Sequence, residues 1–289
     1  MQLIYNHSYN KLIKENNDLH QNYSLDLFIK HYIEIDKCSS AVLIVPTRKY
    51  VDYIKKQWIQ KYYTEHKKAI GKLHIYNLLD FAALVLNEIH KNISIYSDAV
   101  LLNFVEEATQ YLIDNDELKY YKRISFNLLT KMFDVINGLR KEGISADAMN
   151  DELINQNDIS SANKRFHDVS KIYAHYEKLL SEKSINNTDE TGIYNKIIDI
   201  IENNKINEID NNFLNNFSFI NADSMIYFYD FTEFKLPEAK FVSLFNKCKT
   251  PVLVSIDYSK ENGPVIENLP RNVRRLVMNE MNTNMISNS

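Results

Sequence analysis

One stretch of the chain combines basic and aromatic side chains in a way that suits the phosphates and bases of a nucleic acid. Residues 46–72 contain eight lysines and arginines but only two acidic residues. Trp58, Tyr62 and Tyr63 lie among them. Basic side chains can follow the phosphates of a strand while aromatic rings stack on its bases. The same composition is also typical of the solvated face of an amphipathic helix, so both interpretations stay open.

Histidine, cysteine and acidic residues do not have the spacing of a metal or catalytic site. The eight histidines are scattered without an HExxH pattern, and the two cysteines are far apart and lack CxxC spacing. Asp168 and Asp189 suggest a nuclease at first sight, but both are predicted on or beside a helix, whereas a PD-(D/E)xK core needs its acids on adjacent strands. We therefore predict no catalytic residue, no metal and no cofactor.

Composition is that of an average globular protein. The chain has 289 residues, of which 45% are hydrophobic and 25% charged, with a net charge of −4, so we do not expect it to coat nucleic acid over its whole surface. Only five glycines leave little room for glycine-rich phosphate loops. The first residues do not form a signal peptide, and no run of eighteen apolar residues occurs. With its two isolated cysteines, the chain is expected to be cytoplasmic and to make no contact with a membrane.

Five short runs rich in β-branched and aromatic residues predict a mostly parallel sheet with flanking helices, an α/β fold. These runs are residues 2–5, 41–45, 73–76, 225–229 and 252–256. The second run is apolar at every position, as expected of a strand covered on both faces by helices. After it, a helix is predicted whose apolar face contains Val51, Ile54, Trp58 and Tyr62. Asn77 and Asp80, three residues apart, predict the capped start of a second helix.

From about residue 97 to residue 202, apolar residues recur only at helical spacing. Three predicted faces contain Val100, Phe104 and Ala108; Leu128, Met132, Val135 and Leu139; and Phe166, Val169, Tyr173, Tyr176 and Leu180. A run of helices between strands of one sheet predicts an all-helical insertion that folds as a subdomain. We therefore expect an α/β lobe at residues 1–90 and 205–278, the insertion at 91–204, and a disordered tail at 279–289.

The order of these segments resembles the first motor lobe of superfamily 1 helicases, which implies a P-loop NTPase-like sheet. The second conserved motif of that lobe is a hydrophobic run followed by D-E-[FY]-Q-D, and the corresponding stretch here is residues 225–228 followed by 229–233, YDFTE. Tyr229 replaces the magnesium aspartate, Asp230 the catalytic glutamate and Thr232 the glutamine. The aromatic residue and the final acid are kept as Phe231 and Glu233.

The chain is more closely similar to the AddB-type subunits of bacterial helicase–nuclease complexes, whose N-terminal part looks like an inactivated helicase lobe. The matching segments are VPTR at 45–48, NLLDFA at 77–82, the DFTEF turn at 230–234 with LPE after it, and residues 166–180 followed by Asp189. The last of these resembles the family pattern D-[LI]-x-x-I-Y-x-x-Y-x-x-x-L…D. The segments follow the family's order from residue 1 to about residue 278.

The resemblance locates a nucleotide site whose motifs are degenerate here. A working Walker A loop, G-x-x-x-x-G-K-[ST], lets backbone amides approach the phosphates, while its lysine neutralises charge and its hydroxyl holds magnesium. The loop position reads NHSYNKL at residues 6–12, where Lys11 corresponds to the lysine but no glycine precedes it. The resemblance assigns Lys11, Tyr229, Asp230 and Glu233 to this degenerate site. We expect no ATP hydrolysis by this chain.

If the basic stretch is the remnant of a helicase strand-binding surface, Thr47 faces the DNA. The DNA-binding candidates are Thr47, Arg48, Lys49, Lys55, Lys56 and Lys61. The resemblance implies a DNA-binding scaffold in double-strand break repair with two partners: DNA, bound weakly and in a salt-dependent way, and an active helicase–nuclease subunit of the AddA type. Two alternatives are an active superfamily 1 ATPase with divergent motifs and an α/β interaction module unrelated to DNA.

Overall fold

The computed structural model describes residues 2–5, 41–67, 73–89, 93–149, 161–183, 187–203, 225–231, 234–247 and 252–256. The chain divides into two compact units. Unit 1 comprises Met1–Ile89, Tyr194–Phe234 and Glu238–Ser289, and unit 2 comprises His90–Ile193 with Lys235–Pro237. The second boundary lies inside helix α9 (Glu190–Asn203) and not at residue 204, because Tyr194 packs on Phe241 of unit 1 with 5.6 Å between the ring centroids.

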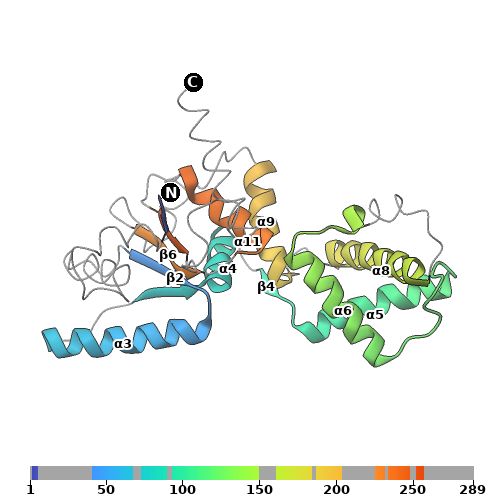
Figure 1. Cartoon of the computed structure of the whole chain (residues 1–289), viewed down its shortest axis with the longest axis horizontal. Helices are drawn as coiled ribbons and strands as arrows, with labels where there is room; N and C mark the ends of the chain where they lie inside the picture. The colour runs from blue at the N-terminus through green and yellow to red at the C-terminus, as the bar shows by residue number, and fades with distance from the viewer. Residues whose placement is uncertain are drawn as a thin grey trace, which may run out of the picture. The chain divides into compact units, whose positions relative to one another are not determined.

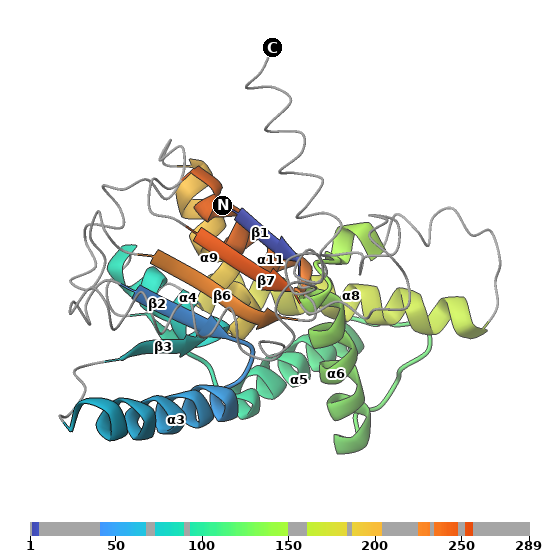
Figure 2. The same cartoon turned by 60° about the vertical axis from the view of Figure 1, so that its left-hand side comes forward.

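Unit 1 contains a five-stranded parallel sheet with the order β1-β7-β6-β2-β3 (Figure 2). Its strands are β1 (Gln2–Tyr5), β2 (Ala41–Val45), β3 (His74–Asn77), β6 (Met225–Phe231) and β7 (Val252–Ile256). All five predicted strands are confirmed, with β3 shifted by one residue and β6 extended to Phe231. Strand β2 lies between β6 and β3 and is buried at every residue, as its wholly apolar sequence predicts.

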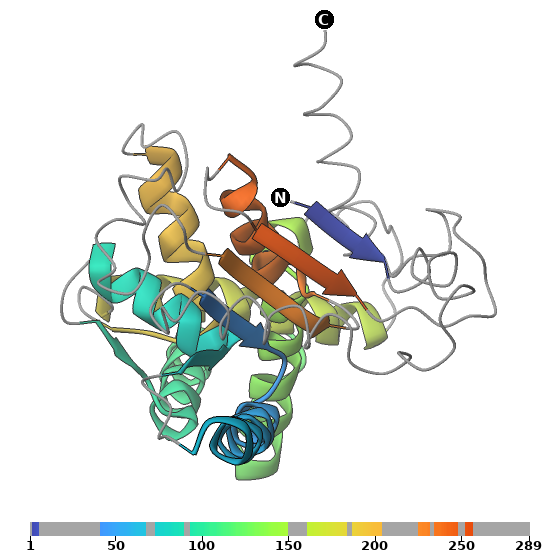
Figure 3. The same ribbon diagram turned by 90° about the vertical axis from the view of Figure 1, so that its left-hand side faces the viewer.

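Helices cover both faces of this sheet (Figures 1 and 3). Strand residues alternate between the two faces. Tyr227 and Tyr229 therefore join the core formed with α3 (Arg48–His66), which includes the predicted residues Val51, Ile54 and Trp58. Phe228 points to the other face, where it contacts Phe81 of α4 (Leu78–Ile89) and Phe245 in the 3₁₀ turn Leu244–Lys247 after α11 (Leu236–Ser243).

Unit 2 is built mainly from three helices, α5 (Asp98–Asp114), α6 (Phe126–Lys141) and α8 (Ser161–Lys183), around one apolar core. Two residues predicted in this core, Val135 and Phe166, are instead 48% and 56% exposed. Helix α6 buries Met132, Phe133 and Ile136, so its inward face is centred near Ile136, and Val135 lies about 100° away around the helix.

The prediction of an all-helical insertion is wrong. Strands β4 (Ser94–Ile95) and β5 (Asn187–Thr188) pair in parallel within unit 2. The pairing continues with a hydrogen bond of 2.8 Å from the Tyr96 N–H to the Thr188 carbonyl. Two residues are too few to show the alternation by which a strand is recognised in a sequence, so the helical pattern on either side concealed them.

Candidate functional site

The sheet of unit 1 changes its winding direction between β2 and β6. From β2 the chain continues to β3 on one side, whereas from β6 it continues to β7 on the other. In open parallel sheets, ligands bind outside the carboxyl ends of the strands at such a switch point. Ile44 of β2 is paired with Phe228 of β6, so β2 ends beside the last residues of β6. The residues that follow these strand ends form the candidate site.

Two tyrosines lie at the switch point. Tyr229, at the position of the magnesium aspartate in the resemblance, is only 8% exposed. Its ring packs against that of Tyr50, in the first turn of α3, with 6.2 Å between the centroids. Burial raises the pKa of the Tyr50 hydroxyl well above its usual range, and the neighbouring Tyr229 and Asp230 raise it further. The Tyr50 phenol is therefore neutral at physiological pH, and a phenol does not offer a cation the charge of a carboxylate.

Asp230, next to Tyr229, has a backbone conformation that is rare for a residue with a side chain. Its φ angle is +62°, in the left-handed region. The residue lies in the part of β6 where the pairing with β7 shifts register, between Phe228 and Phe231. Bulges of this kind redirect side chains, and strained non-glycine residues concentrate at functional sites. Of the four residues predicted for the degenerate site, the structure describes Tyr229 and Asp230, and Asp230 is the acidic one.

The first turns of α3 and α4 hold the predicted residues Thr47 and Arg48 in place. The Thr47 hydroxyl accepts the N–H of Tyr50 at 3.2 Å and so caps α3. Arg48 donates to the Asp80 carboxylate from Nε at 3.2 Å and from Nη2 at 2.7 Å. Asn77 and Asp80 exchange hydrogen bonds of 2.8 Å, which confirms the predicted capping pair. Arg48 is thus occupied by a protein carboxylate, although its side chain is 75% exposed.

The remaining predicted DNA-binding lysines lie along α3. Lys49 and Lys56 are exposed and Lys55 is half-buried. None of these three lysines forms an ion pair with the described part of the chain. The side chain of Lys61 lies outside the described residues. A surface hollow of about 540 Å³ is lined by Asp52, Lys55, Lys56, Ile59, Gln60 and Tyr63.

Sequence reasoning missed two residues, Tyr50 at the switch point and Asp80 in the first turn of α4. Nothing in the sequence connects Asp80 with Arg48, 32 positions away. Tyr50 could have been found, since it follows the capping residue by three positions and so begins the helix beside the strand end. Lys11 and Glu233, the other two residues predicted for the degenerate nucleotide site, lie outside the described residues.

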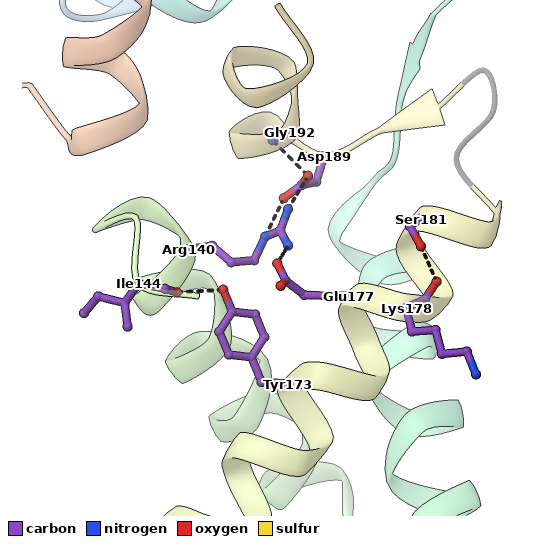
Figure 4. A network of polar contacts seen from close by, with 8 residues as sticks. All are labelled: Arg140, Ile144, Tyr173, Glu177, Lys178, Ser181, Asp189 and Gly192. Carbon is purple, nitrogen blue, oxygen red and sulfur yellow. Dashed lines mark hydrogen bonds and ion pairs between the residues drawn. The ribbon is translucent and has the colours of Figure 1, made fainter. Parts of the chain in front are cut away.

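The two acidic residues that suggested a nuclease are part of the framework of unit 2. Arg140 donates to Asp189 from Nε at 3.2 Å and from Nη2 at 3.0 Å, and to Glu177 from Nη1 at 2.6 Å (Figure 4). Asp189 also accepts the N–H of Gly192 at 3.0 Å. Burial raises the pKa of Glu177, and Arg140 partly opposes this. The Asp189 carboxylate is thus fully used by an internal ion pair and a helix start.

Asp168 has a similar structural role. Its side chain is completely buried and accepts the backbone N–H groups of Lys119, Tyr120 and Tyr121 at 2.9, 2.7 and 3.0 Å. A completely buried carboxylate that accepts several backbone donors fixes the path of the chain and is closed to a ligand from solvent. Among the residues that the structure describes, no group of three or more His, Cys, Asp and Glu side chains could hold a metal ion.

Comparison with known proteins leaves the function to be inferred from this geometry. No family model matches the chain, and no curated protein matches its sequence. Of the helices in the described ranges, none is long and apolar enough to cross a membrane.

Proposed function

We propose that this chain contains a catalytically inactive, P-loop NTPase-like helicase lobe of the AddB type, which acts as a DNA-binding scaffold in double-strand break repair. The observation that carries the proposal is the packing of Tyr229 against Tyr50 at the switch point. This is where a parallel α/β sheet binds its ligand. Two buried or half-buried phenol rings now occupy it, in place of a metal-binding carboxylate.

Loss of nucleotide chemistry follows from what each residue at this edge can do. Phosphoryl transfer needs a cradle of backbone amides, a lysine and a magnesium ion held by an acid. Tyr229 cannot supply the acid, and the sequence at residues 6–12 has no glycine for the cradle. Arg48, an exposed cation in the first turn of α3, is already paired with Asp80. Arg48, Asp80 and Asn77 therefore satisfy one another.

A scaffold role agrees with the rest of unit 1. The sheet is closed on both faces by apolar and aromatic packing, and such a rigid unit can present a surface to a partner. The outer side of α3 carries Lys49 and Lys56 without protein counter-ions in the described part of the chain. In this proposal the lobe works in the cytoplasm beside an active motor subunit of the AddA type and helps to hold DNA near it.

Titration of the whole chain with magnesium-ATP in a calorimeter tests the inactivated site. We expect no saturable heat from the parent protein. Replacing Tyr229 with Asp and Asp230 with Glu restores the acidic pair of an active motor but not the phosphate cradle. This control variant should therefore also give no saturable heat of binding. Saturable binding by the parent that is weakened by Lys11→Ala would overturn the proposal in favour of an active ATPase.

The partner assignment needs a separate experiment. Co-expression with the motor subunit of a helicase–nuclease complex from the same genome should give a complex that co-purifies at a fixed ratio. A genome without such a subunit, or two proteins that elute separately at micromolar concentration, would contradict the assignment to this family even if ATP does not bind.

A further inference from the structure

Helix α3 has two opposite faces of different chemistry. Val51, Ile54 and Trp58 are 7%, 0% and 3% exposed and pack on the sheet. On the other side, residues at successive spacings of four, three, four and three form a single line along the helix, and Lys67, the C-cap residue in the left-handed conformation, follows four positions after the last of them. We call this line together with Lys67 the α3 stripe, and its members are Lys49, Tyr53, Lys56, Gln60, Tyr63 and Lys67. All six are exposed.

The two tyrosines of the α3 stripe are unusually open to solvent. Tyr53 is 58% exposed and Tyr63 is 60% exposed. One side of Tyr53 is supported by Tyr50, with 6.2 Å between the ring centroids and 29° between the ring planes. The ring is therefore held in place while much of its surface stays open, which reduces the entropy lost when a flat ligand stacks on it.

The lysines of the α3 stripe are available for an external anion. Lys49, Lys56 and Lys67 form no ion pair within the described part of the chain, in contrast to Arg48. From Lys49 to Tyr63 the helix rises about 21 Å, at 1.5 Å per residue, and Lys67 lies just beyond its C-terminal end. Cations and rings thus alternate over this length, with a tyrosine on either side of the central lysine.

We infer that the α3 stripe binds single-stranded DNA, with its lysines on phosphates and its tyrosines stacked on bases. Proteins that hold single strands without sequence preference combine these two features. A duplex offers its phosphates but keeps its bases stacked on one another, so it leaves the tyrosines unused. A protein partner would favour aliphatic anchors, and Ile59 is the only large aliphatic residue of α3 among those exposed in the described chain.

This inference deepens the proposed function and rests on it for the biological role of DNA. It also changes the set of residues. Tyr53, Gln60, Tyr63 and Lys67 replace Arg48, which is occupied by Asp80, and Lys55, which is half-buried beside the stripe. The side chain of Lys61 lies outside the described residues, so it is not part of the stripe.

Fluorescence anisotropy of the whole chain with a labelled oligothymidylate tests the site. Three neutralised phosphates predict a slope of about −2 in log affinity against log salt, or a loss of about 20-fold from 50 to 200 mM. Tyr53→Ala and Tyr63→Ala should each weaken binding by about fivefold to a hundredfold and leave this slope unchanged. Replacing Lys49, Lys56 and Lys67 with Gln should remove most of the slope.

Matched controls distinguish binding at the α3 stripe from non-specific binding by exposed lysines and aromatic rings elsewhere. Replacing Lys131, Lys164 and Lys178 with Gln removes the same charge from exposed positions of unit 2, and Tyr111→Ala removes a half-exposed ring there. Neither control should change binding, and circular dichroism should show the helix content of the parent in all variants.

Six results would overturn the inference. Four concern specificity: binding that the stripe variants leave unchanged, an equal loss in the controls, equal competition by duplex DNA, and tighter binding of oligouridylate. The other two are the absence of any binding at 50 mM salt and self-association that Tyr53→Ala and Tyr63→Ala abolish. These results leave the calorimetric test untouched, since that test concerns Tyr229 and the nucleotide site. Conversely, ATP binding with an intact stripe response would overturn only the inactive-lobe proposal.

Discussion

Arg140 is the residue whose removal should destabilise unit 2 most sharply. Its guanidinium is 7% exposed and donates two hydrogen bonds to Asp189, whose side chain is 4% exposed. Arg140→Met keeps most of the apolar stem but leaves the Asp189 carboxylate buried with one remaining donor, the N–H of Gly192. Breaking a buried pair by removing one partner costs about 3–5 kcal/mol. This is a large share of the roughly 5–15 kcal/mol that holds a domain folded.

Urea unfolding followed by far-ultraviolet circular dichroism measures this loss, because unit 2 is mostly helical. Adding Asp189→Asn to Arg140→Met removes the stranded charge but keeps an oxygen for the Gly192 N–H. The double variant should therefore regain about 1–3 kcal/mol over the single one. A loss below 1 kcal/mol for Arg140→Met, or a double variant no more stable than the single, would refute the role of Asp189 as a buried structural anion.

Glu177 provides a graded control on the same guanidinium. Its side chain is 38% exposed, so Glu177→Gln should cost no more than about 1 kcal/mol. Burial raises the folded-state pKa of Glu177 above its ordinary value of 4.5. Its stabilising contribution is then fully present below pH 4.5 and is lost as the pH rises through the folded-state pKa. As the pH rises through this range, the free energy of unfolding of Glu177→Gln should therefore increase relative to that of the parent.

Two further substitutions test single structural features. Asp168→Ala leaves three part-buried backbone N–H groups of residues 119–121 without their acceptor, so we expect a loss of about 1–3 kcal/mol in urea unfolding, and a smaller loss for Asp168→Asn. Near-equal stability of Asp168→Ala and the parent would contradict this. Asp230→Gly should be about 1 kcal/mol more stable than Asp230→Ala. Both variants lose the carboxylate, but only glycine adopts the φ angle of +62° without steric strain. An alanine variant as stable as the glycine variant would show that no strain is stored there.

The sheet could be predicted because each strand carries its own local signal. The run at Ala41–Val45 is apolar at every position, and only a strand with helices on both faces can bury all of it. The pair Asn77 and Asp80 marks a helix start by type and spacing, and the structure confirms it. Such local rules reach only a few residues along the chain.

The site could be predicted less well because its contacts join distant positions. Arg48 pairs with Asp80 across 32 residues, and Arg140 with Asp189 across 49. Charge alone does not identify which acid a basic residue will meet, so the sequence pattern assigned Arg48 to DNA. The left-handed Asp230 also escaped prediction, since aspartate adopts this conformation more readily than most residues and carries no sequence mark of it.

Tyr50 lies between the degenerate nucleotide site and the proposed DNA-binding α3 stripe. Its ring contacts Tyr229 on the side of the switch point and Tyr53 on the side of the α3 stripe. A carboxylate at position 229 would leave Tyr50 without this aromatic neighbour and would place a negative charge beside Asp230. With a tyrosine at position 229, the rings of Tyr229, Tyr50 and Tyr53 form a continuous row from the C-terminal part of β6 to the exposed face of α3. The substitution that ends magnesium binding in our proposal is therefore the same one that supports the ring on which a base would stack.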